Sequence, residues 1–412
     1  MTHLKYIAGT LAACLVALTA SAGDVYQFRG PDRLGVYDET GLLKAWPESG
    51  PPIAWVLEGL GAGVSSVSVV DSKIYVTGMS EDQMGHLYVI SMDGKIEKDI
   101  PYGPETVEKQ SPGTRSTPTI EGNRAYLLSS LGLLCCIDLT AGTKVWEVNI
   151  LERFVGEKIL WDLSESVLID GDRVICTPGG PDALMAALNK NTGETIWTTK
   201  GLKDKASYSS PNIITHNGRR IIVQATGLYI IGVDPETGAL LWSFEQKTPY
   251  DIHGVTPIYS NGLLYYTAGD GLGGGALEIA PDGNSVTSKW LDTNLDCLHH
   301  GVVLVDGYLY GAGFKGDGKL VCVEMATGKH MWTSEEVKLS NVVAADGMLY
   351  CYGSPKSGIV SLVKASPTAF ERTGEFTLTQ GTKQHWAHPT IAHGRLYIRH
   401  GDALVAFDVK AK

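Results

Sequence analysis

The chain has 412 residues, of which 43% are hydrophobic, 19% are charged and 49 are glycine. This composition excludes a coiled coil or other long-helix protein, which would be enriched in Ala, Glu, Lys and Leu, and a disordered chain, which would lack apolar surface to bury. The net charge of −11 argues against nucleic acid as a partner, because that partner requires a basic surface.

The first 22 residues have the features of an export leader. Lys5 precedes an uncharged run over 6–20, and Ala20-Ser21-Ala22 has the small-x-small form of a cleavage site. The run is too short to cross a bilayer comfortably. We therefore predict a signal peptide over 1–22, cleavage before Gly23, and a mature chain without a transmembrane segment.

A second interpretation of this leader stays open. Leu11-Ala12-Ala13-Cys14 resembles a lipoprotein box, which would attach lipid at Cys14. Both interpretations predict an exported protein of the periplasm or the cell surface.

A repeat of 40–50 residues runs through the rest of the chain. Each copy has an apolar strand, an Asp-Gly or Asn-Gly turn, a second strand with Tyr, a third strand and then Thr-Gly-x-x-x-Trp. The terminal tryptophans, which follow one another at intervals of 51, 45, 48 and 42 residues, are Trp146, Trp197, Trp242, Trp290 and Trp332. This interval is typical of a four-stranded propeller blade. We expect each Trp to pack between neighbouring blades.

The paired strands in the first half of the repeat occur eight times, at 67–75, 118–126, 166–175, 211–221, 257–265, 302–310, 342–350 and 389–397. Their turns are predicted to need positive φ at 170–171, 217–218, 261–262, 306–307 and 346–347. We expect Phe376 and the Lys95–Lys98 stretch to replace the missing tryptophans. The last unit lacks a fourth strand, which a segment near 52–57 can supply.

The repeat thus predicts an all-β fold. Residues 23–412 are expected to form one eight-bladed β-propeller of four-stranded antiparallel blades, with the strand near 52–57 closing the last blade. Closure removes exposed sheet edges.

Polar and aromatic residues recur just before each innermost strand, where they should rim one mouth of the central channel: Ser65, Ser66, Arg115, Ser164, Glu165, Tyr208, Ser209, His253, His299, His300, Asn341, His385, Trp386 and His388. Five of the eleven histidines lie at these positions. They either form a functional pocket or make structural hydrogen bonds, and the sequence leaves both interpretations open.

The residue types suggest roles for a pocket. Imidazoles serve as acid, base or metal ligand, Glu165 could be a base, Arg115 could bind a carboxylate or phosphate, and indole rings offer flat faces. The catalytic candidates are Glu165, His253, His299 and His385. The cofactor-binding candidates are Arg115, Trp161, Glu165, His253, His299, His300, Asn341, Trp386 and His388. The spacing of these residues predicts no metal site.

The repeat resembles the PQQ-like β-propeller family, whose blades carry the motif Ala-x-Asp-x-x-Thr-Gly-x-x-x-Trp. The stretches that are most similar to small exported members are Phe28-Arg-Gly-Pro-Asp-Arg-Leu-Gly35, Gly41-Leu-Leu-Lys-Ala-Trp-Pro47, Thr114-Arg-Ser-Thr-Pro-Thr-Ile120 and Cys176-Thr-Pro-Gly-Gly180. The resemblance covers nearly all of the mature chain. It implies the propeller fold and leaves the function open.

Two branches of the family imply different functions. BamB-like members are binding scaffolds of the cell envelope without a cofactor. Quinoprotein dehydrogenases hold pyrroloquinoline quinone (PQQ) and Ca²⁺ near the axis and oxidise alcohols or sugars with a catalytic Asp. Neither that Asp nor the Ca²⁺ ligands align with a motif here. Cys135-Cys136 is similar to the vicinal disulfide of some of these enzymes, although a bridge there would strain an extended strand.

We therefore predict a monomeric binding or scaffold protein whose partner is an envelope protein or a small-molecule or polymer ligand, with no certain cofactor. A PQQ-dependent dehydrogenase with Ca²⁺ and a site at the channel mouth is the alternative.

Overall fold

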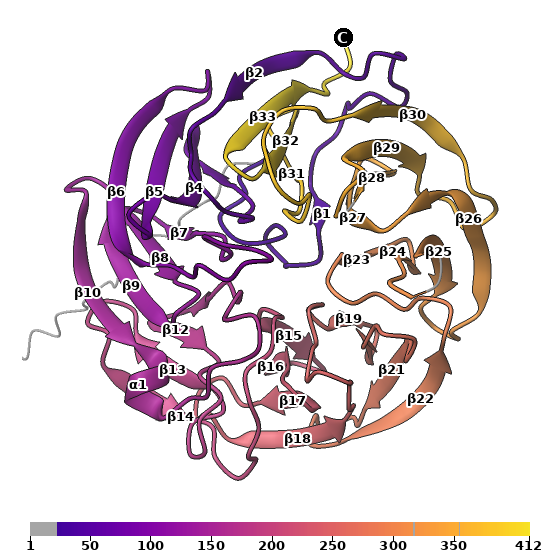
Figure 1. Ribbon diagram of the computed structural model, residues 1–412. Helices are drawn as coiled ribbons and strands as arrows, with labels where there is room; N and C mark the ends of the chain where they lie inside the picture. Colours follow the sequence, from indigo (N-terminus) through magenta and orange to yellow (C-terminus); the bar gives the residue numbers. More distant parts are fainter. Residues whose placement is uncertain (1–22, 316–317, 354) are drawn as a thin grey trace, which may run out of the picture.

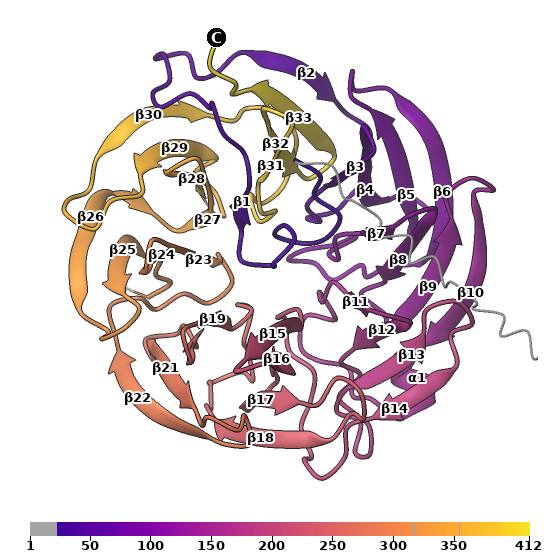
Figure 2. The same cartoon turned by 180° about the vertical axis from the view of Figure 1, so that it is seen from behind.

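Each of the eight predicted strand pairs becomes the inner half of a blade in the computed structural model, which describes residues 23–315, 318–353 and 355–412. The blades stand around a central axis as an eight-bladed β-propeller (Figures 1 and 2). The predicted fold class is confirmed. The predicted leader, including Cys14, lies outside the described residues.

The strands run outward from the axis within each blade. Blade 1 consists of β3 (Ser68–Val70), β4 (Lys73–Met79), β5 (Met84–Ser91) and β6 (Ile96–Pro104), and blade 2 of β7 (Thr119–Glu121), β8 (Arg124–Leu128), β9 (Leu133–Asp138) and β10 (Thr143–Asn149). Blade 3 consists of β11 (Leu168–Asp170), β12 (Arg173–Cys176), β13 (Ala186–Asn189) and β14 (Thr195–Thr198), and blade 4 of β15 (Asn212–His216), β16 (Arg219–Ala225), β17 (Tyr229–Val233) and β18 (Leu240–Glu245).

Blade 5 consists of β19 (Ile258–Ser260), β20 (Leu263–Thr267), β21 (Gly274–Ile279) and β22 (Val286–Asp292), and blade 6 of β23 (Val302–Val305), β24 (Tyr308–Ala312), β25 (Lys319–Glu324) and β26 (His330–Lys338). Blade 7 consists of β27 (Ser340–Ala345), β28 (Met348–Gly353), β29 (Ile359–Lys364) and β30 (Arg372–Thr377), and blade 8 of β31 (Thr390–Ala392), β32 (Arg395–His400), β33 (Ala403–Asp408) and β2 (Ile53–Leu57). A short helix, α1 (Ile150–Phe154), follows β10.

The N-terminal part of the chain closes the ring at blade 8. β2 pairs antiparallel with β33 as its outermost strand, as predicted. A further strand, β1 (Val36–Tyr37), adds in parallel to β27 on the inner edge of blade 7. Within the described residues, no helix is long and apolar enough to cross a membrane.

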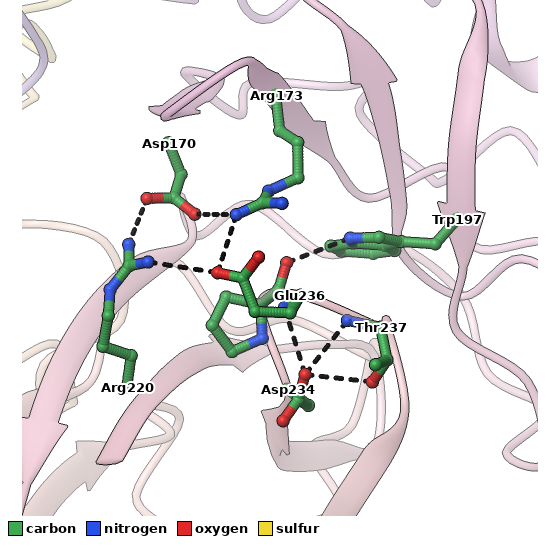
Figure 3. A network of polar contacts seen from close by, with 8 residues as sticks. Asp170, Arg173, Trp197, Arg220, Asp234, Glu236 and Thr237 are labelled. Carbon is green, nitrogen blue, oxygen red and sulfur yellow. Dashed lines mark hydrogen bonds and ion pairs between the residues drawn. The ribbon is translucent and has the colours of Figure 1, made fainter. Parts of the chain in front are cut away.

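Tryptophans of the outermost strands join one blade to the next. The indole Nε1 donates to a backbone carbonyl in the following blade in the pairs Trp55–Met92, Trp146–Lys190, Trp197–Pro235, Trp290–Met325 and Trp332–Ser366, at 2.8–3.1 Å. Figure 3 shows the Trp197 ring against the turn of blade 4. The predicted packing of tryptophan between blades is confirmed at these positions. Buried apolar side chains of neighbouring blades also pack against one another in shared clusters.

The glycine of each Thr-Gly turn serves this packing. Gly238 has φ +73°, and a Cβ there would lie 2.5 Å from the Trp197 ring. Gly193 beneath Trp146 is equivalent, with φ +73° and a distance of 2.8 Å. The repeat therefore needs glycine for its backbone conformation and for its lack of a side chain.

Two blades use other residues at the tryptophan position. In blade 1, the Lys98 ammonium donates to the Leu139 and Thr140 carbonyls of the following turn, at 2.6 and 2.9 Å. In blade 7, two aromatic residues share this position. Phe376 packs on Gly50, and the Trp46 ring lies 5.8 Å from that of Tyr350. The Cβ and backbone of Trp46 lie against Gly374. The sequence predicted Lys98 and Phe376 but not Trp46.

One turn differs from its prediction. Asp306, Asp346, Asn217 and Asn261 have positive φ, as expected. Asp170 does not, because it pairs with Arg173 as the end of β11 and leaves Gly171-Asp172 as the turn. Its carboxylate instead accepts from Arg173 at 3.2 Å and from Arg220 of blade 4 (Figure 3).

Candidate functional site

An N-terminal segment, residues 24–37, crosses one mouth of the channel; we call it the strap. Figures 1 and 2 show this indigo chain at the centre of the ring, where it ends in β1. It contacts seven blades through Val69, Ile120, Val167, Asn212, Val302, Ala344 and Pro389. The strap therefore closes the channel at this end.

Two buried arginines anchor the strap. Arg29 donates to the Val302 carbonyl at 2.7 Å, to the Val342 carbonyl at 3.2 Å and to Nδ1 of His388 at 2.8 Å. Arg33 donates to the Ser166 carbonyl at 2.6 Å. Burial lowers the pKa of both guanidinium groups to about 10, so they stay charged at neutral pH. Charge-assisted bonds to these carbonyls compensate for part of the cost of burial.

A cavity of about 600 Å³ lies on the axis, and Phe28 of the strap is part of its lining. Loops that enter the innermost strands supply most of its lining. The lining residues are Phe28, Val64, Ser66, Glu108, Gln110, Ser111, Arg115, Trp161, Ser164, Tyr208, Ile252, Gly254, Leu298, His299, His300, Phe314, Leu339, Pro355, Trp386 and His388. Its size is within the range of small-molecule sites.

Three histidines form one wall of this cavity. The rings of His299 and His300 stack at 4.2 Å, and His388 Nε2 lies 3.1 Å from the His299 carbonyl. Because Arg29 donates to Nδ1 of His388, the proton of that ring is on Nε2 and is donated to His299. Burial lowers the pKa of His299 to about 4 and those of His300 and His388 well below the usual value. All three are neutral at physiological pH.

Arg115, Trp161 and Tyr208 lie on another wall. The Arg115 side chain is 7% exposed, donates to the Ser111 carbonyl at 2.8 Å and lies 3.9 Å from the Glu108 carboxylate. Burial lowers its pKa, an effect that nearby carboxylates oppose. The rings of Trp161 and Tyr208 are 6.1 Å apart. This wall thus combines a paired cation with flat aromatic faces.

The structure brings together six of the nine predicted cofactor-binding residues. Arg115, Trp161, His299, His300, Trp386 and His388 line the cavity, whereas Glu165, His253 and Asn341 do not. Asn341 is fully buried and donates to the Ala387 carbonyl at 3.2 Å. Of the four catalytic candidates, only His299 is at the cavity.

Glu165 and His253 are buried in protein surroundings. Glu165 accepts from the Thr177 amide at 3.1 Å, and burial raises its pKa to about 8, so the carboxyl is predominantly neutral at pH 7. His253 Nδ1 lies 2.8 Å from the Thr226 carbonyl, and burial lowers its pKa to about 4. Neither arrangement presents a charged group to the axis.

His385 belongs to a separate cluster between blades 7 and 8. Its Nδ1 lies 2.5 Å from the Tyr352 hydroxyl, and its ring stacks on that of His400 at 3.7 Å. Burial lowers its pKa to about 4, and His400 adds to the effect. The contacts of His385 are those of a structural residue.

The sequence did not assign Phe28, Arg29 and Phe314 to the site. Phe28 contributes to the cavity from the strap, with its ring 5.2 Å from that of His388. Phe314 comes from the segment between β24 and β25, 5.9 Å from His299. The Phe28-Arg-Gly-Pro-Asp-Arg motif was visible, but it precedes the first repeat, so blade alignment gave it no position.

The donors around the cavity do not fit Ca²⁺ with PQQ. Ca²⁺ takes six to eight oxygen ligands, carboxylates among them. Glu108 is the sole carboxylate of the lining, and its Oε2 accepts from the Gln110 and Ser111 amides. Over the described ranges, no group of three or more His, Cys, Asp or Glu side chains is placed to hold a metal.

The cysteines do not contribute to the site. All six that the structure describes are free and buried, including Cys135 and Cys136 of β9. Burial raises the pKa of the Cys136 thiol to about 11, which disfavours the reactive thiolate.

A second hollow of about 660 Å³ lies between blades 8 and 1. It includes Tyr88, Lys383 and Asp402, but its lining contains no histidine and only this one aromatic ring. The axial cavity is therefore the better candidate for specific recognition.

Comparison with known proteins places this geometry in context. The family model described as "Outer membrane protein assembly factor BamB" matches residues 53–334. Quinoprotein alcohol dehydrogenase PedH of Pseudomonas putida is 31% identical over 143 residues, which are 33% of this chain and 23% of that protein. Outer membrane protein assembly factor BamB of Kangiella koreensis is 26% identical over 201 residues, which are 48% of this chain and 46% of that protein.

The matched part thus spans less than half the length of either curated relative. Among solved structures, quinohemoprotein alcohol dehydrogenase from Comamonas testosteroni superposes with a TM-score of 0.68. The superposition covers 98% of this chain and 83% of that one at 13% identity. At this identity the likeness concerns the fold alone.

Proposed function

Because this chain belongs to the BamB-like family of PQQ-like β-propellers, we propose that it is an exported binding protein of the cell envelope, with the ring as scaffold and the axial cavity as binding site. The observation that carries the proposal is the lining of that cavity. Aromatic rings and neutral imidazoles from several blades converge there, together with a single, paired cation. Such a surface suits recognition.

Export is part of this proposal. The relatives named BamB are, by their names, outer membrane assembly factors, which supports a location in the periplasm or at the cell surface. N-terminal sequencing of the mature protein tests it. We expect a chain that begins at Gly23, and labelling with palmitate would instead favour lipidation at Cys14.

Photo-crosslinking in intact cells tests the binding site. A photoreactive amino acid at Tyr250, which is 58% exposed and whose ring lies 6.3 Å from that of Trp161, should trap a discrete adduct. The matched control is Val145, 44% exposed on the outermost strand of blade 2. The proposal predicts an adduct at Tyr250 alone. Identical patterns at both positions would contradict binding at the mouth.

A PQQ-dependent dehydrogenase remains the alternative, since PedH, a quinoprotein ethanol dehydrogenase and a 1-butanol dehydrogenase (quinone) are among the curated relatives. Adding PQQ and Ca²⁺ to the purified protein distinguishes the two functions, because a ligand that binds the native state raises its melting temperature. The binding-protein proposal predicts no shift and no dye reduction with alcohols or sugars. A clear shift with dye reduction would establish the alternative.

A further inference from the structure

The axial cavity is nearly uncharged. Of its lining residues, Arg115 and Glu108 are the only ones with a formal charge once the three imidazoles are neutral, and their charged groups lie 3.9 Å apart. An anionic ligand would find the one cation of the lining already paired, and a cationic ligand would find no free carboxylate. The Arg29 charge lies behind His388 and is directed at that ring and at backbone carbonyls. The cavity therefore favours a ligand without net charge.

Flat aromatic rings line the cavity on opposite sides of the axis. Trp161 and Tyr208 precede the innermost strands of blades 3 and 4, whereas Trp386 precedes that of blade 8, on the opposite side of an eightfold ring. Phe28 supplies a further ring from the strap. Ring faces on two sides suit a flat body with C–H groups on both faces.

Several buried hydrogen-bonding atoms of residues that line the cavity have no partner among the described residues. Both ring nitrogens of His300, which is 1% exposed, and Nε of Arg115 are unpartnered. The Tyr208 hydroxyl accepts from the Trp161 amide at 3.0 Å, and no described residue accepts its proton. A neutral imidazole offers one donor and one acceptor. A purely apolar ligand would leave these atoms unsatisfied, which is unfavourable.

We propose that the axial cavity binds a neutral polyhydroxylated ligand, a short oligosaccharide or the end of a glycan chain. A pyranose ring presents C–H groups on its faces and hydroxyls at its edge, and each hydroxyl both donates and accepts. It can therefore stack on Trp161 or Trp386 while its hydroxyls bind His300, Arg115 and Tyr208. This inference rests on the proposed function, since it names the ligand class of the same cavity.

Titration with an array of neutral oligosaccharides, including maltose, cellobiose and chitobiose, tests the inference. Quenching of tryptophan fluorescence and calorimetry report binding, and digalacturonate is the charged counterpart of the same size. We expect a neutral sugar to bind at least tenfold more tightly than digalacturonate. Comparing the preferred oligosaccharide with its polymer distinguishes a free sugar from a chain end.

Two variants connect binding to the cavity. His300→Phe keeps a ring but removes both nitrogens and should weaken binding at least tenfold, whereas the exposed His330→Phe is the matched control and should leave it unchanged. A melting curve shows whether His300→Phe folds. If it does not, Trp161→Ala, at a half-buried rim position, is the second variant that should weaken sugar binding. Sugar binding unaffected by both folded variants would overturn the inference.

Failure of the inference can be distinguished from failure of the proposed function. If all neutral sugars fail while crosslinking at Tyr250 still traps an adduct, the ligand class is wrong and the binding function stands. If the cavity instead prefers a charged ligand, the proposed ligand class is likewise wrong and the binding function stands. If neither sugar nor crosslinked adduct is found, both are wrong.

Discussion

Replacing Arg29 by Met tests whether the strap is an integral part of the propeller. The guanidinium satisfies the carbonyls of Val302, Val342 and Leu34 and Nδ1 of His388, all from within the protein interior. Methionine keeps much of the apolar stem but removes all four hydrogen bonds. At about 1 kcal/mol net for each bond, the loss is about 4 kcal/mol. With a typical unfolding entropy per residue, this lowers the melting temperature by about 5 °C.

Thermal and urea unfolding, followed by tryptophan fluorescence, measure this loss. Arg372→Met is the matched control, because its ion pairs with Glu336 and Glu375 are on the surface and should contribute less than about 1 kcal/mol. Arg29→Lys should be intermediate, since one ammonium cannot reach four acceptors. If Arg29→Met melts within about 1 °C of the control, the anchoring role of the strap is wrong.

The same variant has a spectroscopic signature at the cavity. Burial and the neighbouring Arg29 charge both lower the pKa of His388. Without the guanidinium, Nδ1 loses its donor, so that the pKa should rise and the Nε2–H tautomer should no longer be enforced. Nitrogen-15 NMR of the imidazole rings measures both changes. An unchanged His388 spectrum in the folded variant would contradict the role of Arg29 in positioning this ring.

Three further predictions concern the ring itself. Gly238→Ala should destabilise the protein more than Gly218→Ala by about 1–3 kcal/mol in urea unfolding, because both glycines have positive φ but only a Cβ at 238 would meet Trp197; equal losses would contradict docking as the reason for this glycine. The raised pKa of Glu165, about 8 when folded, makes a contribution to stability that is present below the ordinary pKa of about 4.5 and is lost as the pH rises through 8. Glu165→Gln should therefore reduce the decline in unfolding free energy between pH 6 and pH 8 by up to about 1.4 kcal/mol per pH unit, whereas the exposed Glu97→Gln should not. Dithiothreitol should leave the melting temperature unchanged, because the described cysteines are free, and a drop would reveal a disulfide.

The ring was predictable because its sequence signal is repeated and local. Equivalents of Trp197 and Gly238 recur at the blade interval, because each such pair of tryptophan and glycine makes the same contact between neighbouring blades. Lys98 was predictable by position alone, although its bonds to the next turn were not. Trp46 was missed because it lies against Gly374 from outside the repeat, where a search for a period has no register to compare.

The sequence predicted which loops surround the candidate site, but it did not predict which of their side chains point into the cavity. Alignment of the blades located the loops at the axis, yet it could not decide which side chain of a loop points inward. His299 and Trp386 line the cavity, whereas His253 and Glu165 turn into buried hydrogen bonds with backbone amides and carbonyls. A shift of one residue in an extended segment reverses the direction of a side chain, and loop conformation decides this shift.

The N-terminal part of the chain closes the ring twice. β2 completes blade 8 on the outside, and the strap contacts seven blades on the inside. Because Phe28 lines the cavity and Arg29 fixes His388, the strap also completes the candidate site. A chain that lacks residues 24–37 would lose Phe28 from the lining and the Arg29 guanidinium that positions His388, even if β2 still closed blade 8. The strap thus connects the inner strands of the ring to the candidate site.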